Sequence, residues 1–70
     1  MLGEDHPDAL TAANNLAGDL YGLGDYQQAR ELLEDTLARR RRVLGKDHPF
    51  TRRSAANLAD VLRKLGEAPE

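Results

Sequence analysis

The chain has 70 residues, enough for one small domain, and a core of this size rarely gives more than ~3–5 kcal/mol of net stability. Lys and Arg number 10 against 12 Asp and Glu, so the net charge of -2 gives no general attraction to nucleic acid or to an anionic membrane. The absence of cysteine excludes disulfides, thiolate metal sites and a cysteine nucleophile, and is compatible with a reducing compartment.

No apolar run approaches the ~18 residues of a membrane span, and no charged and then apolar leader opens the chain. We therefore expect a soluble cytoplasmic protein, or a piece of one, without a membrane partner. Arg outnumbers Lys and Ala is abundant, a bias that we associate with a GC-rich bacterial genome.

The first predicted helix runs from Asp8 to Leu23, with the i, i+3, i+4, i+7 spacing of an amphipathic helix. Pro7 suits the first turn, where an amide hydrogen would be unpaired, and Asp8 places negative charge at the positive end of the helix dipole. The apolar positions are Leu10, Ala13, Leu16, Ala17, Leu20 and Leu23.

A turn at Gly24-Asp25 leads to the second predicted helix, from about Tyr26 to Leu44, which Gly45 ends. Its predicted buried stripe is Tyr26, Ala29, Leu33, Leu37 and Leu44, with Leu32 and Val43 on the flanks.

The third predicted helix runs from about Pro49 to Leu65, and Gly66 ends it. Residues 67–70 look like a frayed tail. The apolar stripe of this helix is Ala55, Leu58, Ala59, Leu62 and Leu65.

An internal repeat explains why the first and third helices look alike. The segment Leu2-Gly3-Glu4-Asp5-His6-Pro7 returns as Leu44-Gly45-Lys46-Asp47-His48-Pro49, a period of 42 residues without insertion. Periods of roughly 20 to 50 residues are typical of solenoids. We predict an all-α fold of three helices, an antiparallel helix-turn-helix repeat plus one further helix. A single domain would span residues 1–70, with repeat one at about 2–43, a half repeat at 44–66 and a tail at 67–70.

Two motifs suggest a family. The pattern Gly24-Asp25-Tyr26-x-x-Ala29, preceded by Asn15-Leu16-Ala17-x-x-Leu20 and followed by Leu33 and Leu37, resembles the tetratricopeptide repeat. The Leu-Gly-x-Asp-His-Pro junction and the 42-residue period are similar to its kinesin light chain variant. The chain departs from the usual pattern at Ala13, Ala17 and Arg41. The resemblance implies an α-solenoid fragment of a longer array, a scaffold for protein-protein interaction without catalysis or cofactor.

The same resemblance implies that an extended partner peptide binds a concave groove along the first helix of each unit. Asn15 and Asn57 are the best candidates to hold the peptide backbone. Arg53, Arg63 and Lys64 would favour an acidic peptide or a C-terminal carboxylate. Alternatively, both Asn side chains bond a neighbouring loop and the cations are only solvated. The implied groove positions are Thr11, Asn14, Asn15, Gly18, Tyr21 and Gly22, then Arg53, Ala56, Asn57, Asp60, Arg63 and Lys64.

A second hypothesis is a structural self-assembly unit. The third helix has no following partner helix in this chain, so its exposed face could pair with a second copy and give a homo-oligomer. The candidate residues for this contact are Leu58, Val61, Leu62 and Leu65.

The run from Arg39 to Arg42 invites a nucleic-acid site, but at about 100° per residue its side chains point in four directions. Cations near a helix C-terminus favour the dipole, and Asp35 is a possible partner of Arg39. Exposed aromatic residues for base stacking are also lacking, so we expect no nucleic-acid partner.

His6 and His48 lie one repeat period apart, too far for one metal ion, and each with its neighbouring Asp supplies too few ligands. We instead predict helix-entry loops in which Asp or His caps free amides. No Gly-rich phosphate loop, His-Glu metal motif or Ser with an obvious base is present, so we predict no catalytic residue, metal or cofactor.

Overall fold

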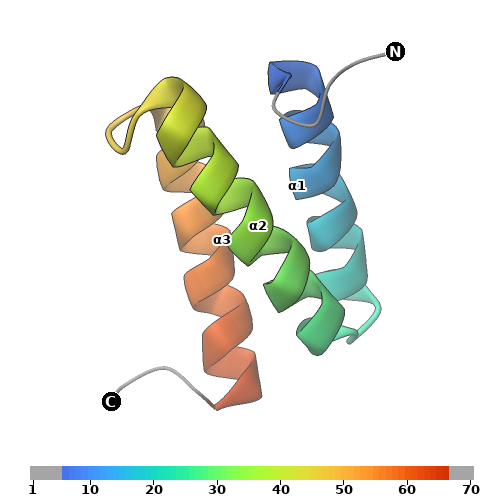
Figure 1. Ribbon diagram of the computed structural model, residues 1–70. Coiled ribbons are helices and arrows are strands. Elements are labelled where there is room, and N and C mark those ends of the chain that lie inside the picture. The colour runs from blue at the N-terminus through green and yellow to red at the C-terminus, as the bar shows by residue number, and fades with distance from the viewer. Residues whose placement is uncertain (1–5, 67–70) are drawn as a thin grey trace.

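The computed structural model describes residues 6–66, which form three helices (Figure 1). Helix α1 spans Pro7–Gly22, α2 spans Tyr26–Leu44 and α3 spans Pro49–Leu65. Helix α2 runs antiparallel to both others and packs against each of them, whereas α1 and α3 make little contact with each other. The predicted all-α fold is therefore confirmed.

The predicted boundaries of the second and third helices are also confirmed, while α1 begins at Pro7 and ends at Gly22 rather than at Asp8 and Leu23. The predicted tail at 67–70 and the first copy of the hexapeptide, apart from its His-Pro, lie outside the described residues. No helix in the described part of the chain is both long and apolar enough to cross a membrane.

Both copies of the His-Pro pair begin a helix in the same way. His6 has φ -65° and ψ 137°, and His48 has φ -64° and ψ 139°. The amide of Asp8 donates to Nδ1 of His6 at 3.1 Å, and the amide of Phe50 donates to Nδ1 of His48 at 3.0 Å. Each imidazole thus satisfies one of the free amides of a helix start. The predicted capping role is confirmed for both histidines.

Glycines end the second and third helices in backbone conformations that other residues rarely adopt. Gly66 is left-handed, with φ 74° and ψ 19°. Gly45 has φ 93° and ψ 156°, a region open almost only to glycine. The chain can therefore reverse between α2 and α3 within a short loop.

The core lies where α2 meets its two neighbours. Ala17, Ala29, Leu33 and Val61 form its buried centre. Half-buried apolar side chains surround this centre: Leu20, Tyr21, Tyr26, Leu32, Leu58 and Leu65.

The predicted apolar stripes are buried only in part. Leu16 is 52% exposed and Leu23 is 82% exposed, and Ala59 is exposed on α3. The physical reason is the order of the helices: α1 and α3 each have one packed neighbour, so each buries only the side that faces α2. Each of these two predicted stripes therefore contains more apolar residues than the contact with α2 buries.

Candidate functional site

A hollow of about 240 Å³ opens between α1 and α3. Its floor is apolar, because Ala17, Leu33 and Val61 there are almost completely buried. Its polar rim consists of predicted groove positions from both helices, namely Gly18, Tyr21, Asn57 and Asp60. Residues that are about 40 positions apart in the chain therefore meet around one concave surface.

Tyr21 and Asn57 lie on the rim of this hollow, on α1 and α3 respectively. The ring of Tyr21 packs edge-on against that of Tyr26, with centroids 5.3 Å apart and planes at 63°, so its position is fixed by the core. Asn57 is half-buried, and its side-chain amide has no hydrogen-bond partner within residues 6–66. An amide offers both a donor and an acceptor, which matches the alternating groups of a peptide backbone.

The predicted cations lie along α3 with different partners. Arg63 forms an ion pair with Asp60, three residues earlier on the same helix. The guanidinium of Arg53 lies 5.9 Å from the centroid of the Phe50 ring, and Lys64 is exposed. Positive charge is thus available beside the groove, although Asp60 compensates part of it.

Three predicted positions on α1 lie away from the hollow. Asn14 is only 7% exposed, and its Oδ1 accepts a hydrogen bond from Oγ of Ser54 at 3.0 Å. Thr11 is exposed, and its Oγ1 accepts from Nη2 of Arg40 at 3.3 Å. Asn15 is exposed but does not line the hollow. Asn14 is therefore a correction: its side chain joins helices in the interior instead of facing a groove.

Sequence reasoning missed a buried arginine. Arg40 is 3% exposed, and its Nη1 donates to the backbone oxygen of Phe50 at 2.8 Å and to Oγ of Ser54 at 2.9 Å. The backbone oxygen of Arg40 in turn accepts from Oγ1 of Thr51 at 3.3 Å. The guanidinium also lies 5.4 Å from the centroid of the Phe50 ring, within range of a cation-π contact. One side chain of α2 thus connects to α1 and α3 together.

Electrostatics set Arg40 apart from its neighbours in the run. Burial, and then the charge of nearby Arg53, lowers the pKa of the Arg40 guanidinium from its ordinary value. No carboxylate within residues 6–66 pairs with it. A signal for its burial was present, because position 40 lies three residues after Leu37 and four before Leu44, on the predicted stripe of α2.

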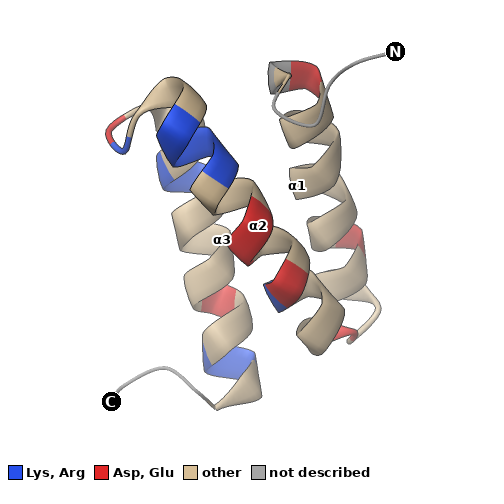
Figure 2. Ribbon diagram, in the orientation of Figure 1, with Lys and Arg blue, Asp and Glu red and all other residues tan. Residues whose placement is uncertain are grey.

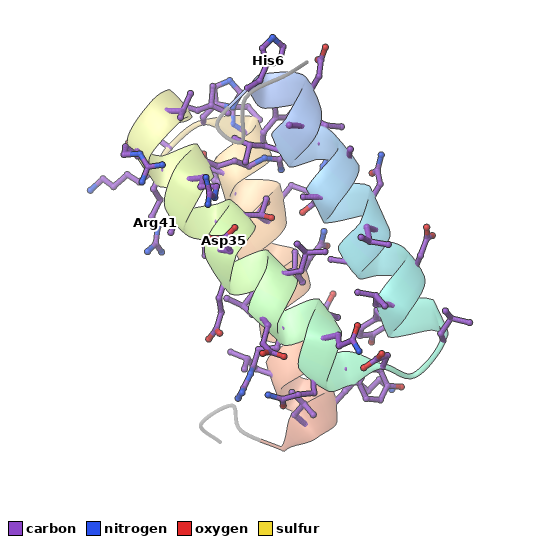
Figure 3. The ribbon with its side chains drawn as sticks, turned by 45° about the vertical axis from the view of Figure 1, so that its right-hand side comes forward. His6, Asp35 and Arg41 are labelled. Atoms are coloured by element: carbon purple, nitrogen blue, oxygen red, sulfur yellow. The ribbon has the colours of Figure 1, made fainter. Side chains whose placement is uncertain are left out.

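The other arginines of the run differ in exposure, since Arg39 is half-buried whereas Arg41 and Arg42 are exposed. Nε of Arg39 donates to Oδ2 of Asp35 at 2.9 Å, which confirms the predicted pair. Arg41 is exposed and points away from the helix bundle (Figure 3). Cations gather at the C-terminal half of α2, whereas the described part of α1 carries only acidic charges (Figure 2). Within residues 6–66, His and carboxylate side chains form no cluster that could hold a metal ion.

The surface predicted for self-association is largely part of the core. Val61 is 1% exposed and belongs to the buried centre, so its side chain is not available to a second copy. Leu58 and Leu65 are half-buried and pack against that centre, and Leu62 is half-buried. Of the four predicted residues, Val61, Leu58 and Leu65 therefore belong to the core or pack against it.

The sequence of this chain is similar to that of one known protein family. A family model of the tetratricopeptide repeat matches residues 8–70. A search of curated proteins found no match to the chain.

Proposed function

Because the chain belongs to the tetratricopeptide repeat family, a family of protein-protein interaction modules, we propose that it binds an extended partner peptide in the groove between α1 and α3. The observation that carries this proposal is the hollow in which Tyr21 and Asn57, from different repeat units, share one rim above an apolar floor. Concave sites with an apolar lining and a few directed polar groups are typical of ligand sites.

Two features of the groove suit an extended peptide. The apolar floor at Ala17, Leu33 and Val61 can receive one peptide side chain. The amide of Asn57 can then donate to a peptide carbonyl and accept from a peptide N–H on the same strand. The residue types therefore support recognition of backbone as well as of one side chain.

Charge favours an acidic peptide or a C-terminal carboxylate as the partner. Arg53 and Lys64 are exposed beside the groove on α3. Arg63 can exchange Asp60 for a peptide carboxylate at little cost, because an exposed pair on one helix contributes only about 0–1 kcal/mol. A guanidinium can offer two parallel donors to the new partner.

We also propose that the repeat is the long variant found in kinesin light chains. The 42-residue period supports this assignment, since ordinary units of the family have about 34 residues. The His-Pro helix starts, which repeat with matching backbone angles at His6 and His48, support it as well.

Peptides selected from a phage-displayed random library on the wild-type protein provide the test. We expect the selected peptides to carry acidic residues and to lose about tenfold in affinity for Asn57→Ala, as loss of hydrogen bonds to one side chain predicts. Asn15→Ala is the matched control, because it changes the same residue type one repeat earlier but outside the hollow. Selected peptides that bind Asn57→Ala and Tyr21→Ala as well as wild type would refute the groove.

A further inference from the structure

The buried guanidinium of Arg40 bonds to both α1 and α3 and fixes the direction of the hydrogen bonds around it. A guanidinium has N–H donors and no acceptor, so each side chain that is bonded to it must accept. Its Nη2 donates to Oγ1 of Thr11 on α1 at 3.3 Å, and its Nη1 donates to Oγ of Ser54 on α3 at 2.9 Å. The hydrogens of both hydroxyls must therefore point away from Arg40.

The two hydroxyl groups differ in what lies on their other side. Oγ of Ser54 donates to Oδ1 of Asn14 at 3.0 Å, in a buried contact. Thr11 lies at the surface, and within residues 6–66 its hydroxyl bonds only to Arg40. Its hydrogen is therefore available to an acceptor that arrives from solvent. The buried cation thus holds the hydroxyl of Thr11 as an exposed donor.

Positive charge in this region has no counter-charge among the described residues. Nε of Arg40 is buried and has no hydrogen-bond partner there. The guanidinium groups of Arg40 and the exposed Arg53 lie 5.4 Å and 5.9 Å from the centroid of the same Phe50 ring. Neither guanidinium pairs with a carboxylate within residues 6–66. Two neighbouring cations without a carboxylate favour the binding of an anion.

The repeat places Thr11 and Arg53 at equivalent positions of neighbouring helices. They are 42 residues apart, and each lies in the second turn of its helix. Helices α1 and α3 run parallel and begin at the same end of the molecule (Figure 1). The positive ends of both helix dipoles therefore lie at this end and add to the attraction for an anion.

We propose that Thr11 and Arg53, together with the buried Arg40, form an oxyanion site. The ligand is a carboxylate or phosphate group, which an acidic side chain of the partner peptide or free phosphate can supply. Arg53 binds this group through two N–H donors and Thr11 through its hydroxyl, while Arg40 is a positioning residue that acts through Thr11. Arg40 lies on α2, outside the groove positions that the resemblance implies. Supply of the group by a peptide rests on the proposed function, whereas the site itself rests on the contacts of Arg40.

Distances along the helices predict where a bound peptide would carry its acidic residue. Thr11 precedes Gly18 by seven residues, and Arg53 precedes Asn57 by four. At ~1.5 Å per helical residue, the oxyanion site lies roughly 6–10 Å from the rim of the hollow. An extended chain rises about 3.3 Å per residue, so the acidic residue is expected about two or three positions from the apolar residue that enters the hollow.

A phosphate titration of the full isotope-labelled chain, followed by NMR, tests the site. At neutral pH and an ionic strength held constant with sodium chloride, we expect the amide signals of Thr11 and Arg53 to shift and to saturate. Arg53→Gln should weaken the affinity for phosphate about tenfold, because it removes a charge and two donors. Arg52→Gln is the matched control, since it makes the same change at an exposed position about 100° away around the helix, and it should leave the affinity unchanged.

A double-mutant cycle separates the positioning role of Arg40 from its effect on stability. Thr11→Val removes the hydroxyl while keeping the shape of the side chain, and it should weaken phosphate binding about threefold. In the Arg40→Met background the same change should have no effect, because the hydroxyl is no longer held as a donor. Equal weakening in both backgrounds would overturn the role of Arg40. If Arg40→Met does not fold, unchanged affinity in the single Thr11→Val variant would still overturn the site.

Peptides selected on the wild-type protein distinguish the two sources of the oxyanion. If the peptide supplies it, phosphate competes with the peptide, and replacing one Asp or Glu of the peptide by its amide costs about tenfold on wild type but nothing on Arg53→Gln. If free phosphate is the ligand, it binds without changing the affinity for the peptide. Failure of the groove, seen as unchanged peptide binding by Asn57→Ala, leaves the phosphate titration as it is.

Two further outcomes would overturn the inference. The first is the absence of saturation up to about 100 mM phosphate, where a specific site no longer differs from general ionic screening. The second is equal weakening of phosphate binding by Arg52→Gln and Arg53→Gln, which would assign the shifts to the overall charge of this region.

Discussion

Replacing Arg40 should destabilise the protein far more than replacing the arginine next to it. The side chain of Arg40 is almost completely buried and bonds to Phe50 and Ser54 of α3, whereas Arg41 is exposed. Substitution of Arg41 thus serves as the control for substitution of Arg40. Arg40→Ala and Arg41→Ala remove the same atoms from adjacent positions of one helix, so helix propensity changes equally in both.

The expected loss of stability follows from three contributions at Arg40, of which one opposes the other two. Each hydrogen bond from a charged donor contributes about 1.5–3 kcal/mol, and Nη1 makes two with good geometry, at 2.8 Å and 2.9 Å. Burial of a cation without a carboxylate partner costs several kcal/mol, and Arg40→Ala relieves it. Loss of the packed side-chain stem adds to the destabilisation. We expect a net loss of about 2–3 kcal/mol for Arg40→Ala and less than about 0.5 kcal/mol for Arg41→Ala.

Urea unfolding followed by far-UV circular dichroism measures both changes. A chain of this size has only about 3–5 kcal/mol of net stability, so Arg40→Ala should begin to unfold in little or no urea. Arg40→Met keeps the stem and removes the charge, and it should lose about 1 kcal/mol. Equal midpoints for Arg40→Ala and Arg41→Ala would refute the reasoning. A midpoint of Arg40→Met above that of wild type would show that burial of the charge outweighs its hydrogen bonds.

Two further predictions concern the ends of the helices and use the same urea assay. His48→Ala should lower the free energy of unfolding by about 1 kcal/mol because the amide of Phe50 loses its acceptor. His48→Asn restores a capping oxygen and should therefore retain most of this stability. Equal losses in the two variants would rule out capping by His48. Gly45→Ala should destabilise the protein by about 1–3 kcal/mol, and Gly66→Ala should destabilise it by less. The reason is that Gly45 has φ 93° and ψ 156°, while Gly66 is in the left-handed region, which other residues reach more easily. A larger loss for Gly66→Ala than for Gly45→Ala would contradict this reasoning.

The sequence predicted the helices well because their ends carry local signals. Pro49 begins α3, and Gly45 and Gly66 end α2 and α3, so the boundaries depend on residues next to them. Burial depends instead on how many neighbours a helix has. Leu16 and Leu58 occupy the same repeat position, yet Leu16 is exposed and Leu58 packs on the core, since only α3 has α2 on that side.

Some of the residues that line the hollow between α1 and α3 were among the predicted positions. Family positions identified Tyr21, Asn57 and Asp60, which meet around the hollow. They could not separate Asn14 from Asn15, because adjacent helical residues differ by about 100° and the direction of the interior depends on packing. Arg40 was missed because a charged residue inside a run of charges indicates a solvated surface, whereas its hydrogen bonds to Ser54 and Phe50 stabilise the buried position.

Helices α1 and α3, which occupy equivalent positions in successive repeat units, begin in the same way and share their leucine spacing. They differ at the positions that contact the buried Arg40. Thr51 and Ser54 supply the hydroxyls that contact Arg40, whereas the equivalent positions on α1 are Ala9 and Ala12. The polar contacts of Arg40 with these hydroxyls therefore belong to the packing of α2 on α3, and the corresponding positions of α1 offer no hydroxyl for a contact of this kind.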